Sequence, residues 1–142
     1  MPATLDAAIE QSHLALAAIL NSNPKLYQAL FADREDITLG NPFGPYARGA
    51  ANVAATLANA ASRYKDGTAV EVELVAKYVS DSLACVVEVE RGRAKVGGSD
   101  ELANIAARVT SVFQIIDGEW RLVHRHADPI TSPRESSSVI AR

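Results

Sequence analysis

The chain has 142 residues, with 14 Lys and Arg against 17 Asp and Glu, so its formal net charge is -3. Apolar residues make up 48% of the sequence and aromatic residues 6%. This length predicts a single soluble globular domain with a core large enough to enclose one pocket. The acidic balance and the scattered basic residues argue against nucleic acid as a partner, because a phosphate-backbone binder needs a clustered basic face.

The longest stretches without a charged residue, 11–24 and 49–62, are too short for a membrane span, which needs about 20 apolar residues. The N-terminal residues have neither the basic start nor the apolar core of a signal peptide. The single cysteine, Cys85, excludes an internal disulfide and is expected to be a buried, reduced thiol. These features together predict a cytoplasmic protein.

The first half of the sequence has helical spacing. Apolar residues recur every three to four positions over residues 5–20, and a proline at 24 ends that helix. A short second helix is expected over residues 25–31, followed by a strand at 37–39 and a loop at 40–45 with two glycines and two prolines. A third helix is expected to open at Arg48-Gly49 and to end at Asp66-Gly67.

The second half alternates β-branched and polar residues, which predicts four antiparallel strands at residues 70–80, 83–90, 105–116 and 119–128. Asp117-Gly118 is a hairpin signal, residues 80–82 form a second turn, and residues 92–104 a longer mobile connection. Three helices and a bent sheet give an α+β domain in the order α-α-β-α-β-β-β-β, with the helices on one concave face. The domain is expected to span residues 1–130, and residues 131–142 are expected to form a loose tail in which Val139-Ile140 could dock on a neighbour.

Two segments of the sequence resemble a known superfamily. The segment from Ile37 to Gly44, followed by Arg48-Gly49 and a helix, is similar to the loop of bacterial ketosteroid isomerases. The ending from Asp117 to His126 resembles SnoaL-like proteins of the nuclear-transport-factor-2-like group and the hub domain of calcium/calmodulin-dependent kinase. The resemblance, over about residues 4–130, implies a cystatin-like cone that encloses an apolar pocket and forms a homodimer through its sheet.

The ketosteroid isomerase mechanism does not transfer to this sequence. Asn41 stands where the resemblance places the isomerase's aspartate base, and an amide cannot accept a proton in that role. The oxyanion-hole tyrosine would fall near Ala15, and the protonated aspartate beside it near Ser111. Since a positioned base and each oxyanion donor contribute orders of magnitude in rate, we expect no ketosteroid isomerase activity.

Two charged residues are candidates for catalysis inside the cone. Glu88 shares a strand face with Val86 and Glu90, and this face is either a solvated outer surface or the interior, where Glu88 could act as acid or base. Counting from the Asp117-Gly118 turn, the family pattern places Arg125 inward, to pair with Glu88 or to hold an anionic ligand. Strict alternation puts Trp120, Leu122, His124 and His126 on the opposite face.

Four further residues are candidates for ligand contacts. Asn41 either points into the pocket or bonds its own backbone in a turn. Tyr27 and Tyr46 are placed at the pocket mouth, and Ser111 offers a polar contact inside. His13 is interpreted as a partly buried surface residue, and His124 and His126, without a third ligand, are interpreted as packing or interface residues, so no metal is expected.

The leading hypothesis is a SnoaL-like domain that binds a small, largely apolar organic molecule. If the molecule reacts, the reaction class is proton transfer, as in isomerisation, cyclisation or dehydration. Glu88 would be the base, Arg125 or Asn41 would stabilise the oxyanion, and no cofactor would be needed. The alternative is a non-catalytic oligomerisation or ligand-binding domain, with His124 and His126 in a subunit interface.

Overall fold

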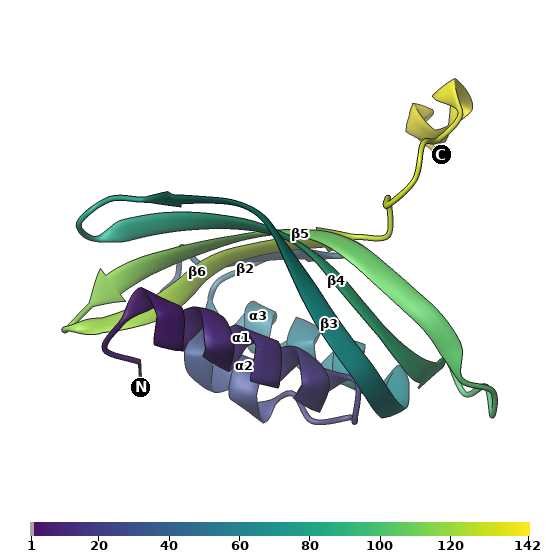
Figure 1. The fold of residues 1–142 in the computed structure, drawn as a ribbon, viewed down its shortest axis with the longest axis horizontal. Helices are drawn as coiled ribbons and strands as arrows, with labels where there is room; N and C mark the ends of the chain where they lie inside the picture. The colour runs from purple at the N-terminus through teal and green to yellow at the C-terminus, as the bar shows by residue number, and fades with distance from the viewer. Residues whose placement is uncertain (1) are drawn as a thin grey trace.

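The computed structural model describes residues 2–142 and has the predicted α+β architecture, with helices packed on one side of a curled sheet (Figure 1). In chain order the elements are α1 (Leu5–Ile19), α2 (Lys25–Leu30), β1 (Thr38–Asn41), β2 (Gly44–Arg48), α3 (Ala50–Ala61), β3 (Tyr64–Val79), β4 (Leu83–Val96), β5 (Ala103–Ile116), β6 (Glu119–Asp128) and the short 3-10 helix η1 (Ser136–Val139).

The sheet has six strands in the order β2-β1-β6-β5-β4-β3. All neighbours are antiparallel except β1 and β6, which run parallel. The four predicted long strands are present, and three of them extend beyond the predicted bounds, so the connection expected over residues 92–104 is short. The prediction of a loop through residues 40–45 was wrong at both ends, because β1 continues to Asn41 and Gly44 begins β2. Pro45 is compatible with this strand since β2 lies at the sheet edge, where no N–H is needed on the outer side.

The third helix ends at Ala61, earlier than predicted, and Asp66-Gly67 belongs to β3. Here β3 passes the C-terminal end of α1, and the Gly67 amide donates a hydrogen bond to the Leu20 carbonyl at 3.1 Å. A Cβ on Gly67 would lie 2.9 Å from the Leu20 carbonyl oxygen, so the close approach of the two backbones requires glycine. Gly67, which the sequence predicted at the end of a helix, therefore lies within β3, where the pairing of β3 with β4 is irregular.

The alternation predicted for β6 is broken by one residue. Val112 pairs with His124 and Phe113 pairs with Leu122, which leaves Val123 as an extra residue in a β-bulge. The bulge shifts the alternation, so Leu122, with 0% of its surface exposed, and Arg125, with 8%, both face the helices. The prediction that Trp120 and Leu122 face away from Arg125 was wrong, since both belong to the hydrophobic core.

Both predicted tight turns are confirmed. Asp117 and Gly118 have φ values of 52° and 80°. Positive φ at both residues is what a two-residue hairpin turn needs to match the right-handed twist of its strands. The Ser80 amide donates to the Leu83 carbonyl across the second turn.

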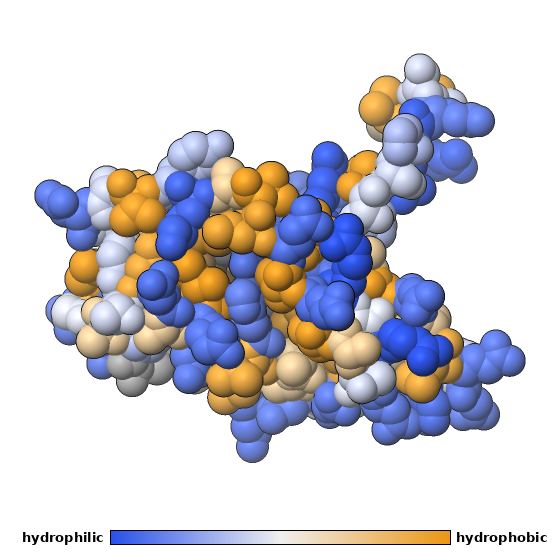
Figure 2. Space-filling view, viewed as in Figure 1, coloured by the Kyte–Doolittle hydropathy of each residue, from blue (hydrophilic) through white to orange (hydrophobic). Residues whose placement is uncertain are grey.

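Residues 131–142 are exposed along their whole length, and Figure 1 shows them leading away from the sheet. Val139 and Ile140 are 86% and 66% exposed. Figure 2 shows the same segment standing clear of the body, whose visible face carries hydrophobic patches separated by hydrophilic residues. Among residues 2–142, no helix is both long and apolar enough to cross a membrane. The cytoplasmic location stays a prediction.

Candidate functional site

A cavity of about 560 Å³ lies between the helices and the concave side of the sheet. Its walls combine apolar side chains of α1, β1, α3 and β5, among them Leu16, Ile19, Leu39, Leu57 and Ile105. The β1–β2 turn contributes Asn41, Pro42 and Phe43, and the chain after β6 contributes Pro129 and Thr131. Polar groups reach the cavity from α2, β4 and β6 as Tyr27, Glu90 and Arg125. The site is thus an apolar cavity with a small charged floor, which is the usual composition of a small-molecule pocket.

Arg125 is inside the fold, as predicted, but it pairs with a different glutamate. Its two terminal nitrogens donate to the two carboxylate oxygens of Glu90 at 2.9 and 2.7 Å. Both residues are buried. Burial alone would lower the pKa of Arg125, but the adjacent Glu90 carboxylate outweighs it and raises that pKa, so the guanidinium stays charged. The pairing of Arg125 with Glu88 expected from the sequence was wrong.

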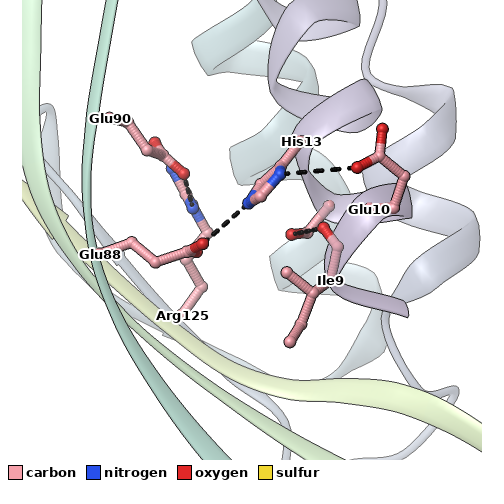
Figure 3. Close-up of polar contacts among 7 residues, drawn as sticks. Ile9, Glu10, His13, Glu88, Glu90 and Arg125 are labelled. Carbon is pink, nitrogen blue, oxygen red and sulfur yellow. Dashed lines mark hydrogen bonds and ion pairs between the residues drawn. The ribbon is translucent and has the colours of Figure 1, made fainter. Parts of the chain in front are cut away.

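Glu88 is also buried, which confirms the interior face and excludes the solvated alternative. His13 of α1 donates a hydrogen bond from Nε2 to Glu88 Oε2 at 2.8 Å, and its Nδ1 lies 4.0 Å from the exposed Glu10 (Figure 3). The hydrogen bond to Glu88 raises the pKa of His13, although burial opposes this shift. Figure 3 shows Arg125 flanked by the carboxylates of Glu88 and Glu90. From α1 to the sheet, the side chains of four residues with alternating charge therefore follow one another: His13, Glu88, Arg125 and Glu90.

Tyr27 lies at the floor of the cavity, and not at its mouth as predicted. It is 2% exposed, and the guanidinium of Arg125 lies 5.1 Å from the centre of its ring. Its hydroxyl is the one buried side-chain polar atom within residues 2–142 that has no hydrogen-bond partner. Burial raises the pKa of Tyr27, so the hydroxyl keeps its proton.

Asn41 forms the predicted turn and also lines the cavity, while its contact with a ligand stays a prediction. Its side-chain oxygen accepts a hydrogen bond from the Phe43 amide at 3.0 Å, which shapes the β1–β2 turn. The same residue lines the cavity. Ser111 is buried on β5, directly opposite Arg125 on β6 and Val86 on β4, but it does not line the cavity.

Tyr46 was predicted at the pocket mouth, and this placement was wrong. Its hydroxyl is hydrogen-bonded to His126 Nδ1 at 3.1 Å, and its ring lies over Gly40. Gly40 pairs with His126, so Tyr46 lies on the sheet face opposite the cavity, where it is 62% exposed. His124 is on the same outer face, hydrogen-bonded to Thr38. The placement of both histidines away from the cavity is confirmed.

Sequence reasoning missed the roles of Glu90 and His13. The signal for Glu90 was present, because it shares the inward face of β4 with Glu88. For His13 the sequence held no such signal, since its partner is 75 residues away on the sheet. In the part of the chain that the structure describes, no three His, Cys, Asp or Glu side chains are grouped so as to hold a metal ion.

Comparisons with known proteins agree with this architecture. None of the curated proteins matches the chain. A ketosteroid isomerase-like protein from Erwinia carotovora atroseptica is similar in structure, with a TM-score of 0.74, 16% identity, and coverage of 90% of this chain and 95% of that one. A nuclear transport factor 2-like superfamily protein from Salmonella enterica serovar Typhimurium gives a TM-score of 0.71 at 19% identity, covering 94% and 93% of the two chains.

A third similar structure, from Thiobacillus denitrificans, is assigned as a calcium/calmodulin-dependent protein kinase type II association domain. Its TM-score is 0.72 at 20% identity, with coverage of 92% of this chain and 98% of that one. At these identities the three structures show a shared fold and nothing finer. The sequence profile described as "SnoaL-like domain" matches residues 8–131, which is most of the chain. The protein therefore belongs to the SnoaL-like domain family.

Proposed function

We propose that this domain binds a small, largely apolar organic molecule in the cavity between the helices and the sheet. The observation that carries the proposal is the cavity itself, about 560 Å³ in volume, with apolar walls from α1, β1, α3 and β5 and a buried Arg125–Glu90 pair at its floor. Pockets for small organic molecules commonly enclose about 300–1,000 Å³ and combine apolar walls with a few polar groups.

Proton transfer on the bound molecule is the reaction class that the sequence suggests, with Glu88 as base and Arg125 or Asn41 stabilising an oxyanion. The geometry supports binding more directly than turnover. Both oxygens of Glu90 already accept hydrogen bonds from Arg125, and Glu88, held by His13, is not among the residues that line the cavity. The catalytic roles of Glu88 and Arg125 stay predictions.

The binding proposal is tested with N-phenyl-1-naphthylamine, an uncharged dye that becomes fluorescent in apolar sites. Ala107 faces the cavity from β5, opposite Glu90, so Ala107→Phe fills part of the space. We expect this variant to bind the dye at least about tenfold more weakly, a loss of about 1.4 kcal/mol. Ala103→Phe is the matched control, because Ala103 is exposed on the same strand and does not line the cavity. Equal affinity of wild type and Ala107→Phe would place the dye elsewhere and contradict the proposal.

Self-association through the outer face of the sheet is a second candidate function. Cys85, Val87 and Val112 form a half-buried apolar centre on that face, next to Tyr78, which is 64% exposed. The proposed partner is a second copy of this chain, which would cover these residues. Sedimentation velocity tests it: Val112→Lys is expected to shift a dimer to monomer, whereas Leu26→Lys, on the exposed surface of α2, is not. A wild-type protein that stays monomeric at high concentration would exclude this function.

A further inference from the structure

The hydroxyl of Tyr27 is buried and makes no hydrogen bond to the described part of the chain. It is the one buried side-chain polar atom of the described chain that has none, and it belongs to a residue that lines the cavity. Leaving a buried hydroxyl without a hydrogen-bond partner destabilises the folded state. Such an orphan beside a cavity indicates that its partner is supplied from outside the chain.

The surroundings of Tyr27 determine which kind of ligand group its hydroxyl can bind. Burial raises the pKa of the phenol, and the hydroxyl therefore remains a neutral donor. The nearest charged groups are satisfied by one another: Arg125 has both terminal nitrogens on Glu90, and Glu88 accepts from His13. A charged ligand beside Tyr27 would have to break one of these buried pairs to gain a counter-charge, which is costly. The other charged residue of the cavity lining, Arg91, is exposed and already paired with Glu73.

We propose that Tyr27 is the ligand-recognising group of the cavity and that it donates a hydrogen bond to the carbonyl oxygen of an uncharged, apolar molecule. This inference rests on the proposed function, because it assumes that the cavity is a binding site. It names a position on α2 that the resemblance to ketosteroid isomerases does not, since that resemblance places the isomerase's tyrosine near Ala15. The hydroxyl exposes less than 1 Å², so the proposal requires Tyr27 to rotate about χ1 on binding; rotation about χ2 would leave the hydroxyl oxygen in place.

The test uses three probes of similar shape: 2-acetylnaphthalene, 2-isopropylnaphthalene and 2-naphthoate. Their affinities are measured by displacement of N-phenyl-1-naphthylamine from wild type, Tyr27→Phe and Tyr46→Phe. We expect wild type to bind the ketone about tenfold more tightly than the hydrocarbon, the value of one hydrogen bond at a site that otherwise leaves a donor unpaired. The naphthoate should bind more weakly than the ketone. Tyr27→Phe should abolish the preference for the ketone, and Tyr46→Phe, which makes the same change outside the cavity, should keep it.

The outcomes separate the two proposals. If neither the dye nor any probe binds, the proposed function fails and this inference fails with it. If the dye binds but wild type does not prefer the ketone, or Tyr27→Phe keeps the preference, the cavity is a binding site and the role of Tyr27 is wrong. A naphthoate that binds more tightly than the ketone overturns the uncharged ligand class. The wild-type comparison of the three probes decides the ligand class even if Tyr27→Phe does not fold.

Discussion

Both carboxylate oxygens of Glu90 accept hydrogen bonds from the guanidinium of Arg125, in an environment where each residue exposes less than a tenth of its surface. This two-bond geometry joins β4 to β6 across β5 at the floor of the cavity. The charges are stable there only as a pair, because each would otherwise be an uncompensated ion in the interior.

Removing only one member of this pair should therefore destabilise the fold strongly. We expect Arg125→Met to lower the free energy of unfolding by about 3–5 kcal/mol, because Glu90 is left without its cation. The double variant Arg125→Met/Glu90→Gln should recover most of this loss. Urea unfolding of the wild type, the two single variants and the double variant gives the coupling energy. Additive losses would show that the two side chains do not depend on each other.

The family pattern, aligned on the Asp117-Gly118 turn, predicted that Arg125 points inside, whereas the sequence left open whether Glu88 faces the interior or the solvent. It could not predict the partner of Arg125. The register aligns Arg125 with Ser111 and, beyond it, with Val86, and not with either glutamate. Strand twist and side-chain length then decide which carboxylate the guanidinium reaches, and neither is encoded in a local pattern.

The wrong predictions for Trp120 and Leu122 on β6 and for Tyr46 on β2 have the same origin, because each depends on how strands pair in the folded sheet. The bulge at Val123 depends on how β6 fits β5, so strict alternation misplaced Trp120 and Leu122. Tyr46 is near Asn41 in sequence but on the other face of the sheet, because the residues around Gly44 form a strand and not a loop. Helix positions and most strand positions follow from spacing, whereas pairing across the sheet and contacts such as His13 with Glu88 arise only in the folded chain.

The His13–Glu88 contact makes stability depend on pH. Because the pKa of His13 is raised above its usual value of 6.5 in the folded state, the fold binds this proton more tightly than the unfolded chain does. The stabilisation is complete below pH 6.5 and is lost as the pH rises through the raised pKa. We therefore expect the stability difference between wild type and His13→Gln to shrink as the pH increases above 6.5.

Urea unfolding of the two proteins at several pH values from 6 to 9 measures this difference. A second histidine, His124, also makes stability depend on pH, but in a lower pH range. Burial, and then the neighbouring His126, lowers the pKa of His124, so its contribution to the stability changes below pH 6.5. His124→Gln is thus the control, with a difference from wild type that stays constant above pH 6.5. A constant difference for His13→Gln over the same range would mean that His13 does not carry an extra proton in the folded state.

The C-terminal segment should be dispensable for the fold. All residues from 131 onward are exposed, and removing residues 133–142 takes away no buried side chain. We expect the shortened chain to unfold in urea within about 0.5 kcal/mol of the full chain. If Val139 and Ile140 dock on a neighbouring copy, sedimentation velocity will show weaker self-association of the shortened chain while its unfolding at low concentration stays the same. A clear loss of stability in the monomer would instead place the segment in the domain.

The crossing of β3 over the end of α1 sets the position of the helix that lines one wall of the cavity, and it depends on Gly67. A methyl group there would meet Leu20, whose carbonyl carbon and oxygen would lie 3.0 and 2.9 Å away. Since backbone cannot move aside as a flexible side chain does, Gly67→Ala should cost about 1–3 kcal/mol of unfolding free energy. Gly44→Ala is the matched control, because nothing lies within 4 Å of the added atom, and its effect should stay within about 0.5 kcal/mol. Equal stability of the two variants would mean that α1 can shift away from β3 at little cost, and in that case the cavity wall formed by Leu16 and Ile19 would not be rigidly placed.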